Sequence, residues 1–217
     1  MSETSFITRR TLALAAIAAV ASPGAVLAAP ARPVVTLLGD SITAGYGLPS
    51  ALALPTQLQA ALDAAKVRAL VRGAGVSGDT TAGGLSRVDF SVQKDTAVCV
   101  IALGGNDFLR GVAPAQTRAN LEAIVRKLRA RRIKVVLAGL IAPPFVAQIY
   151  GEPYVREFNA VFPTVAKAQG VPLLPDLLAG VSANGALNQG DGIHPNAEGV
   201  KVIARRLATL VSRSLRA

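Results

Sequence analysis

The sequence predicts an α/β fold built on one parallel sheet of five strands, with helices on both faces of the sheet. Short apolar runs alternate with longer segments of helical spacing along the chain, and this alternation is typical of a parallel sheet covered by helices. Several of the runs end in glycine, as buried parallel strands do. The 217 residues can bury a sizeable core, and the single cysteine, Cys99, excludes an intramolecular disulfide framework.

The first half of the predicted sheet comes from three apolar runs. Residues 34–38 end at a glycine, residues 67–71 suit a second strand, and residues 97–103 give the strongest strand signal. Between these strands, residues 52–65 are rich in alanine, leucine and glutamine at helical spacing, and residues 80–88 suit a short helix or turn.

The second half repeats this pattern. A helix is predicted over residues 114–131, which begin with proline, where the missing N–H of a first helical residue is tolerated. Residues 134–140 and 171–174 are predicted strands. Residues 154–169 form a helix between them, and residues 195–215 close the chain as an amphipathic helix.

Residues 1–28 are expected to be an export signal rather than part of the fold. Arg9 and Arg10 give a positively charged start, and the apolar stretch that follows, residues 12–21, is too short to span a bilayer comfortably. The arginine pair resembles a twin-arginine signal, although Sec signals also carry two arginines. An uncleaved membrane anchor is the alternative interpretation.

Cleavage is expected after Ala28 or Ala29, which leaves residues 29–217 as one domain, exported to the periplasm or secreted. The full chain has 23 basic and 13 acidic residues. Without the two arginines and one glutamate of the signal, 21 basic and 12 acidic residues remain, a formal net charge of +9.

Residues 126–134 are unusually basic, with six positive charges in nine residues. The six are Arg126, Lys127, Arg129, Arg131, Arg132 and Lys134. We interpret them as the solvated end of a helix. The alternative is a patch that makes transient contact with an anionic membrane surface. No aromatic residue is interleaved with the charges, which argues against nucleic acid as a partner.

Three chemically suggestive segments follow predicted strands. They are residues 39–41 (Gly-Asp-Ser), 75–79 (Gly-Val-Ser-Gly-Asp) and 104–107 (Gly-Gly-Asn-Asp). Ligands of parallel α/β sheets bind beyond the carboxyl ends of the strands. All three segments are therefore expected to meet at one edge of the sheet.

His194 is the only histidine, so it is the only imidazole that could act as a base, and a histidine-rich metal site is excluded. Asp191 stands three residues before it, and Gly192 and Pro195 favour a tight loop over a continuous helix. In such a loop Asp191 could accept the Nδ1–H of His194 and leave Nε2 free as a proton acceptor. The alternative is a helix-entry loop in which Asp191 makes a turn hydrogen bond.

Ser41 is the candidate nucleophile, and it does not lie in a G-x-S-x-G elbow because Thr43 occupies the last position. It is expected at the start of a helix after the first strand, where backbone N–H groups favour negative charge. Ser41 could instead serve only as a helix cap. For Asp40 we favour a structural role.

Acyl transfer also needs hydrogen-bond donors that face the developing oxyanion. Gly78 could offer its backbone N–H and Asn106 its side-chain amide. Each residue also fits an ordinary turn at a strand end.

Four ordered blocks resemble those of the SGNH (GDSL-type) hydrolase family. They are Gly39-Asp40-Ser41, Gly78 in a Ser-Gly-Asp-Thr context, Gly104-Gly105-Asn106-Asp107 and Asp191-Gly192-Ile193-His194-Pro195. The strings G-D-S-I-T-A-G-Y-G-L, L-G-G-N-D and D-G-I-H-P are similar to its arylesterase and acyl-CoA thioesterase I/lysophospholipase L1 branch.

The resemblance implies a flavodoxin-like three-layer α/β/α sandwich and a cofactor-free, metal-free serine esterase. It implies that Ser41 is the nucleophile and that Asp191 and His194 are its base pair. It also implies three oxyanion donors: the backbone N–H groups of Ser41 and Gly78 and the side-chain amide of Asn106. The expected substrates are small-molecule or lipid esters: aryl or short to medium acyl esters, lysophospholipids or thioesters. Export argues against CoA thioesters as natural substrates.

Two apolar loops are expected to receive the acyl or aryl group, residues 108–112 and 140–146. Their candidate contact residues are Phe108, Leu109, Pro144 and Phe145. The alternative function is a catalytically inactive module of the same fold that binds lipid or glycan. A nucleotide binder is disfavoured because the Walker lysine pattern and G-x-G-x-x-G are absent. Acyl chain length and oligomeric state stay open at this level.

Overall fold

The structure is a computed structural model that describes Met1 and residues 31–216. The predicted export signal and its cleavage site lie outside these described residues. Residues from Arg32 onward form one compact unit, and the fold below is that of this unit.

The core of the unit is a five-stranded sheet in which every paired strand is parallel, as predicted. The spatial order is β2-β1-β3-β4-β5. The strands are β1 (Val34–Gly39), β2 (Leu70–Gly75), β3 (Thr96–Ala102), β4 (Lys134–Ala138) and β5 (Leu173–Leu174). Strand β1, which lies between β2 and β3, is buried along its whole length. Its one hydroxyl, on Thr36, is paired with Thr96 Oγ1 at 2.8 Å, which removes the cost of burying it unpaired.

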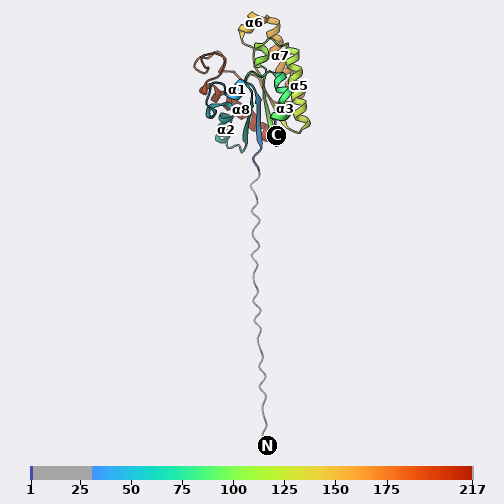
Figure 1. Cartoon of the computed structure of the whole chain (residues 1–217), viewed down its shortest axis with the longest axis vertical. Coiled ribbons are helices and arrows are strands. Elements are labelled where there is room, and N and C mark those ends of the chain that lie inside the picture. The colour runs from blue at the N-terminus through green and yellow to red at the C-terminus, as the bar shows by residue number, and fades with distance from the viewer. Residues whose placement is uncertain (2–30, 217) are drawn as a thin grey trace. The chain divides into compact units, whose positions relative to one another are not determined.

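Helices cover both faces of the sheet, so the layers are α/β/α, as predicted (Figure 1). α2 and α8 pack together on one side, and α3, α5 and α7 form the other layer. The helices are α1 (Ser41–Ala44), α2 (Leu54–Ala64), α3 (Thr81–Ser91), α4 (Gly105–Leu109), α5 (Pro114–Ala130), α6 (Pro144–Tyr150), α7 (Glu152–Gln169) and α8 (Ala197–Arg216), with a 3-10 turn at Ser50–Leu52.

Amphipathic spacing explains why the long helices pack on the sheet. In α5 the buried Leu121, Ile124, Val125 and Leu128 recur at intervals of one, three and four residues, which places them on one face. In α8 the buried residues follow the same period from Val200 to Val211. The polar faces of both helices point to solvent.

The strand order creates a switch point between β1 and β3. The chain leaves β1 toward α2 on one face and leaves β3 toward α5 on the other. In doubly wound sheets the crevice at such a point, beyond the carboxyl ends of the strands, is where ligands bind. Gly39 and Ala102 are the last residues of these two neighbouring strands.

Most predicted elements agree with the structure to within three residues at each end, but β2 differs more. It was expected at residues 67–71 and runs from Leu70 to Gly75. Its apolar content drops after Val71, yet pairing with β1 continues to Gly39↔Gly75. The strand ends in glycine because the backbone of α1 is too close to leave room for a side chain. A Cβ on Gly75 would lie 2.3 Å from the backbone nitrogen of Ala44.

The two predicted apolar loops are partly helical, which corrects the sequence interpretation. Phe108 and Leu109 lie at the end of α4, and Pro144 and Phe145 begin α6. Two consecutive prolines read as a loop in the sequence, but Pro144 stands at the start of α6, where its missing N–H costs no helical hydrogen bond.

Candidate active site

Ser41, His194 and Asp191 form a continuous hydrogen-bonded chain at the carboxyl edge of the sheet. Ser41 Oγ lies 2.9 Å from His194 Nε2. His194 Nδ1 lies 2.6 Å from Asp191 Oδ2. Ser41 is the first residue of α1, directly after β1, and the other two residues come from the loop before α8. The structure thus brings together residues 153 positions apart in the sequence.

Asp191 makes several of the hydrogen bonds that hold the loop carrying His194. Asp191 Oδ1 accepts the backbone N–H groups of Ile193 and His194, both at 2.9 Å, while Oδ2 faces the imidazole. Gly192 adopts a φ of +70°, which glycine reaches without strain. Hydrogen bonds from the His194 backbone N–H, the imidazole and the Ile193 N–H lower the pKa of Asp191 to about 2. The carboxylate is therefore charged at neutral pH. It faces His194 Nδ1, whereas Ser41 faces Nε2.

Asp40 caps the short helix α1, which agrees with a structural role. Its Oδ1 accepts the backbone N–H of Ile42 at 3.0 Å. Only 4% of Asp40 is exposed, and burial raises its pKa to about 6, partly offset by the Ile42 N–H and by the nearby His194. Asp40 thus orients the turn that presents Ser41.

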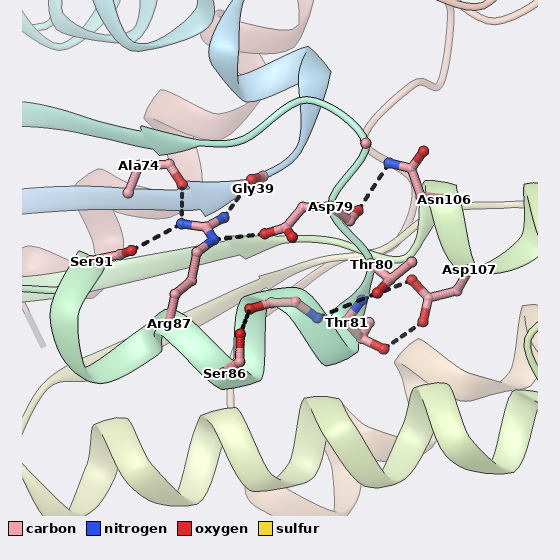
Figure 2. Close-up of polar contacts among 12 residues, drawn as sticks. Gly39, Ala74, Asp79, Thr80, Thr81, Ser86, Arg87, Ser91, Asn106 and Asp107 are labelled. Carbon is pink, nitrogen blue, oxygen red and sulfur yellow. Dashed lines mark hydrogen bonds and ion pairs between the residues drawn. The ribbon is translucent and has the colours of Figure 1, made fainter.

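The two candidate oxyanion donors come from neighbouring loops that contact each other. Asn106, on α4, donates from Nδ2 to the backbone carbonyl of Asp79 at 2.9 Å (Figure 2). Gly78 precedes Asp79 and has a φ of +81°. Among the described residues, none accepts the backbone N–H of Gly78 or of Ser41. An amide NH₂ carries two donors, so one Asn106 N–H is also available for a substrate.

A buried polar network fixes α4 to the start of α3. Asp107 is fully buried, and its Oδ2 accepts the backbone N–H of Thr81 at 2.8 Å. Its Oδ1 accepts the hydroxyls of Thr81 at 2.5 Å and Thr117 at 3.2 Å. Asn120 donates to Thr81 Oγ1 at 3.0 Å. Because Asp107 follows Asn106 in the chain, this network sets where the Asn106 amide stands (Figure 2).

Two further residues beside the site were not found by sequence reasoning. The ring of Tyr46 packs on the imidazole of His194 with centroids 4.5 Å apart, and the Tyr46 carbonyl accepts a hydrogen bond from Gln189. Arg87 binds Asp79 from α3. Tyr46 belongs to the G-D-S-I-T-A-G-Y string, whereas Arg87 sits in a helix with no motif to signal it.

An apolar cavity of about 250 Å³ lies beside the His194 loop. The four candidate contact residues, Phe108, Leu109, Pro144 and Phe145, all line it. Gly192 and Ile193, from the loop between Asp191 and His194, complete its wall together with Leu140, Ile141, Pro143, Leu178, Ser182 and Ala183. The structure therefore brings the predicted acyl contacts together next to the catalytic candidates. Phe108 also packs edge-on against Phe158, so it belongs to the core as well.

The basic segment lies at the opposite edge of the sheet, where β4 begins. Lys127 pairs with Asp89 at 2.7 Å and Arg126 with Glu122 at 3.6 Å. Arg129 donates to the backbone carbonyl of Gln169 and Arg131 to that of Val92. These contacts within the chain fit the solvated end of α5.

In the part of the chain that the structure describes, no group of three or more histidine, cysteine, aspartate or glutamate residues is arranged to hold a metal ion. The buried thiol of Cys99 has its pKa raised to about 12 by burial, so it stays protonated. In the same residues, no helix has the length and apolar character needed to span a membrane.

Comparison with known proteins gives consistent results. The family model described as "GDSL-like Lipase/Acylhydrolase family" matches residues 37–202. Esterase TesA of Pseudomonas aeruginosa is 41% identical over 160 residues, covering 73% of this chain and 78% of that protein. Thioesterase 1/protease 1/lysophospholipase L1 of Escherichia coli (strain K12) is 35% identical over 181 residues, covering 83% and 84%. The crystal structure of the psychrotrophic esterase EstA from Pseudoalteromonas sp., inhibited by monoethylphosphonate, has a TM-score of 0.78 at 27% identity and covers 86% of this chain and 100% of that one.

Proposed function

Because the chain belongs to the GDSL-like lipase/acylhydrolase family and is therefore a serine ester hydrolase, we propose that Ser41 is its nucleophile, His194 its general base and Asp191 the carboxylate that orients the base. The observation that carries this proposal is the unbroken contact from Ser41 Oγ through the imidazole to Asp191, at 2.9 and 2.6 Å. Both distances are those of hydrogen bonds between a nucleophile, its base and the group that orients the base.

The first half-reaction acylates the enzyme. Ser41 Oγ attacks the ester carbonyl carbon as its proton passes to His194 Nε2, and the resulting oxyanion is held by the N–H groups of Ser41, Gly78 and Asn106. The imidazolium then gives this proton to the leaving alkoxide, the C–O bond breaks and the alcohol departs. Asp191 stabilises the imidazolium without taking its proton.

The second half-reaction returns the enzyme to its starting state. Water replaces the alcohol and loses a proton to His194 Nε2 as its oxygen attacks the acyl carbon. The second tetrahedral intermediate collapses, the acid departs, and Ser41 Oγ recovers the proton from the imidazolium. The tautomer needed at the start has its proton on Nδ1, which is the nitrogen that faces the charged Asp191.

For the substrate, we propose aryl esters and esters of short to medium acyl chains, with the acyl group in the apolar cavity. Its volume of about 250 Å³ is small for a ligand site, since drug-sized ligands occupy roughly 300–1,000 Å³. The exposed Leu109, Ile141 and Ile193 surround the same cavity, so a lysophospholipid chain could extend past its mouth.

We also propose that residues 1–28 direct export and are removed after Ala28 or Ala29. The twin arginine, the short apolar stretch and the small residues near the cleavage point support this proposal. All candidate site residues lie after Arg32, within the compact unit.

The nucleophile is tested by replacing Ser41 and by labelling it. Ser41→Ala should abolish hydrolysis of p-nitrophenyl acetate, with a loss in kcat of about 10⁴-fold or more, while circular dichroism stays unchanged. An organophosphonate should add one adduct to the wild-type protein, located on Ser41 by peptide mass spectrometry. Ser86→Ala, which changes an exposed serine on α3, serves as the matched control and should keep full activity. Retained turnover in Ser41→Ala, or an adduct elsewhere, would overturn the assignment.

A further inference from the structure

We infer that Arg87 is a positioning residue for the oxyanion hole. Its guanidinium holds residues 76–79, and through them Gly78 and Asn106, against the strand end that precedes Ser41. The inference rests on the proposed function, because that proposal names Gly78 and Asn106 as donors. Arg87 lies on α3 and acts only through the residues it holds.

The guanidinium makes four hydrogen bonds, three of them to β1, β2 and the loop after β2, and one to Ser91 on its own helix (Figure 2). Arg87 Nε donates to Asp79 Oδ2 at 2.6 Å. Nη2 donates to the carbonyl of Gly39 at 2.9 Å, and Nη1 to the carbonyl of Ala74 at 2.9 Å and to Ser91 Oγ at 3.1 Å. One side chain therefore joins the ends of β1 and β2 to the loop that follows β2.

Asp79 transmits this restraint to both proposed donors. Its backbone carbonyl accepts the Asn106 amide at 2.9 Å, and its own nitrogen closes the turn by donating to Val76 at 3.1 Å. Gly78 lies within this turn and directly precedes Asp79. Any movement of Asp79 therefore moves the Gly78 N–H and the partner of the Asn106 amide together.

The same contact relates the donors to the nucleophile. Gly39 is two residues before Ser41, and its carbonyl accepts both Arg87 Nη2 and the backbone N–H of Val76. The distance between nucleophile and oxyanion donors is thus set by one planar group. A misplacement of about 1 Å in such a site can cost on the order of 10²-fold in rate.

Arginine is suited to this position because its rigid fork offers five N–H donors at fixed angles. The ion pair is well shielded, with 17% of the Arg87 side chain and 14% of the Asp79 side chain exposed. Asp79 is also confined from the other side, since a Cβ on Gly83 would lie 2.0 Å from Asp79 Oδ1. A lysine could hold the charge of Asp79 but could not reach both strand carbonyls from a single nitrogen.

A role in folding alone makes a different prediction from a role in positioning. If Arg87 only stabilised the fold, its loss would lower the melting temperature and leave kcat per folded molecule unchanged. The chain offers a matched control in Arg72, on β2, whose fork binds Asp95 at 2.8 and 2.9 Å on the surface. Among the described residues, no side-chain hydrogen bond joins either member of that pair to residues 76–79 or Asn106.

The first experiment measures kcat and KM for p-nitrophenyl acetate in Arg87→Met, Arg87→Lys and Arg72→Met. Active enzyme is counted by phosphonate titration of Ser41. We expect kcat per titrated site to fall about 10- to 100-fold in Arg87→Met, with KM within about threefold, because the loss falls on transition-state stabilisation. Arg87→Lys keeps a charge opposite Asp79 and should show a smaller loss, and Arg72→Met should match the wild type. An unchanged kcat per titrated site in both Arg87 variants overturns the inference.

The second experiment is a double-mutant cycle with Asn106→Ala. If Arg87 acts through the donors, the fold-loss in kcat caused by Arg87→Met should be several-fold smaller in the Asn106→Ala background than in the wild type. The reason is that the effects of residues that act as a unit are not additive. Full additivity overturns the inference. Phosphonate labelling of Ser41 in the wild-type protein is independent of that result, so the proposed function can stand even if the role of Arg87 fails.

Discussion

Three groups meet at His194, and each has a separate effect on the imidazole. Asp191 Oδ2 faces Nδ1, Ser41 Oγ faces Nε2, and the ring of Tyr46 lies against the side of the imidazole. Because the pKa of Asp191 is lowered to about 2, this carboxylate stays charged through the mildly acid range. Activity lost on moderate acidification is therefore not expected to come from protonation of Asp191.

Asp40 gives a prediction about pH and stability at the residue scale. Its pKa in the folded protein is about 6, above the ordinary value of 3.8, so between these values the folded state binds more protons than the unfolded state. The contribution of Asp40 to the free energy of unfolding therefore falls as the pH rises from about 4 to 6. The titratable groups that act on Asp40 are His194, which lowers its pKa, and Asp79, which raises it.

Asp40→Asn should therefore raise the free energy of unfolding at pH 8 by up to about 3 kcal/mol, and the gain should vanish below about pH 4. Asparagine keeps an oxygen for the Ile42 N–H, so the helix cap survives. Melting temperatures across pH 3.5–8 measure the effect, with the exposed Asp63→Asn as the control. A stabilisation that does not depend on pH would show that burial of the charge is not its cause.

At the scale of elements, the site depends on how α3, α4 and α5 are fastened together. Thr81 begins α3, Asp107 lies in α4, and Thr117 and Asn120 lie in α5, and their side chains form one buried cluster. Buried polar groups that are fully paired give rigidity, and leaving one unpaired is costly. The position of Asn106 thus rests on contacts behind it.

Thr81→Val tests this fastening with little change in shape. Valine removes the hydroxyl that Asp107 accepts at 2.5 Å and that accepts Asn120 at 3.0 Å. We expect the free energy of unfolding to fall by about 1–3 kcal/mol, seen as a lower urea midpoint with an unchanged slope. Thr56→Val, which removes one exposed hydrogen bond, should cost much less. Equal losses in both variants would contradict a special role for the cluster.

The sequence identified strands and long helices well because apolar runs and helical spacing report burial directly. It also predicted that the segments carrying Ser41, Gly78 and Asn106 would meet at one edge, since each of these segments follows a strand end. It failed at β2, where glycines pack against α1 and carry no apolar signal, and at α6, where prolines hide the start of a helix. Arg87 could not be found because its importance comes from which carbonyls fold against it.

At the scale of the whole molecule, the site and the start of the domain lie at opposite edges of the sheet. β1 runs from Val34, at the edge where β4 also begins, to Gly39, next to Ser41. α8 ends near the same edge as the start of β1 (Figure 1). Both ends of the compact unit therefore lie at the edge of the sheet away from the His194 loop.

Export and signal cleavage can be tested by expression of the full chain. When the full chain is produced in a Gram-negative host, the exported protein should begin after Ala28 or Ala29, as measured by intact mass. Replacing Arg9 and Arg10 by lysine should block export by the twin-arginine route. A chain beginning at Arg32 should have the kcat and KM of the processed form. Recovery of only the unprocessed protein in the cell interior would contradict the proposal.

The solitary histidine also makes the enzyme its own spectroscopic probe. With one imidazole in 217 residues, the ring resonances in a nitrogen-15 or proton NMR spectrum belong to His194 without any assignment. The tautomer proposed for His194, its proposed proton exchange with Ser41 and the reaction of a phosphonate with that serine can each be followed at one signal. The protein should accordingly be purified without a polyhistidine tag, because added imidazoles would hide that signal.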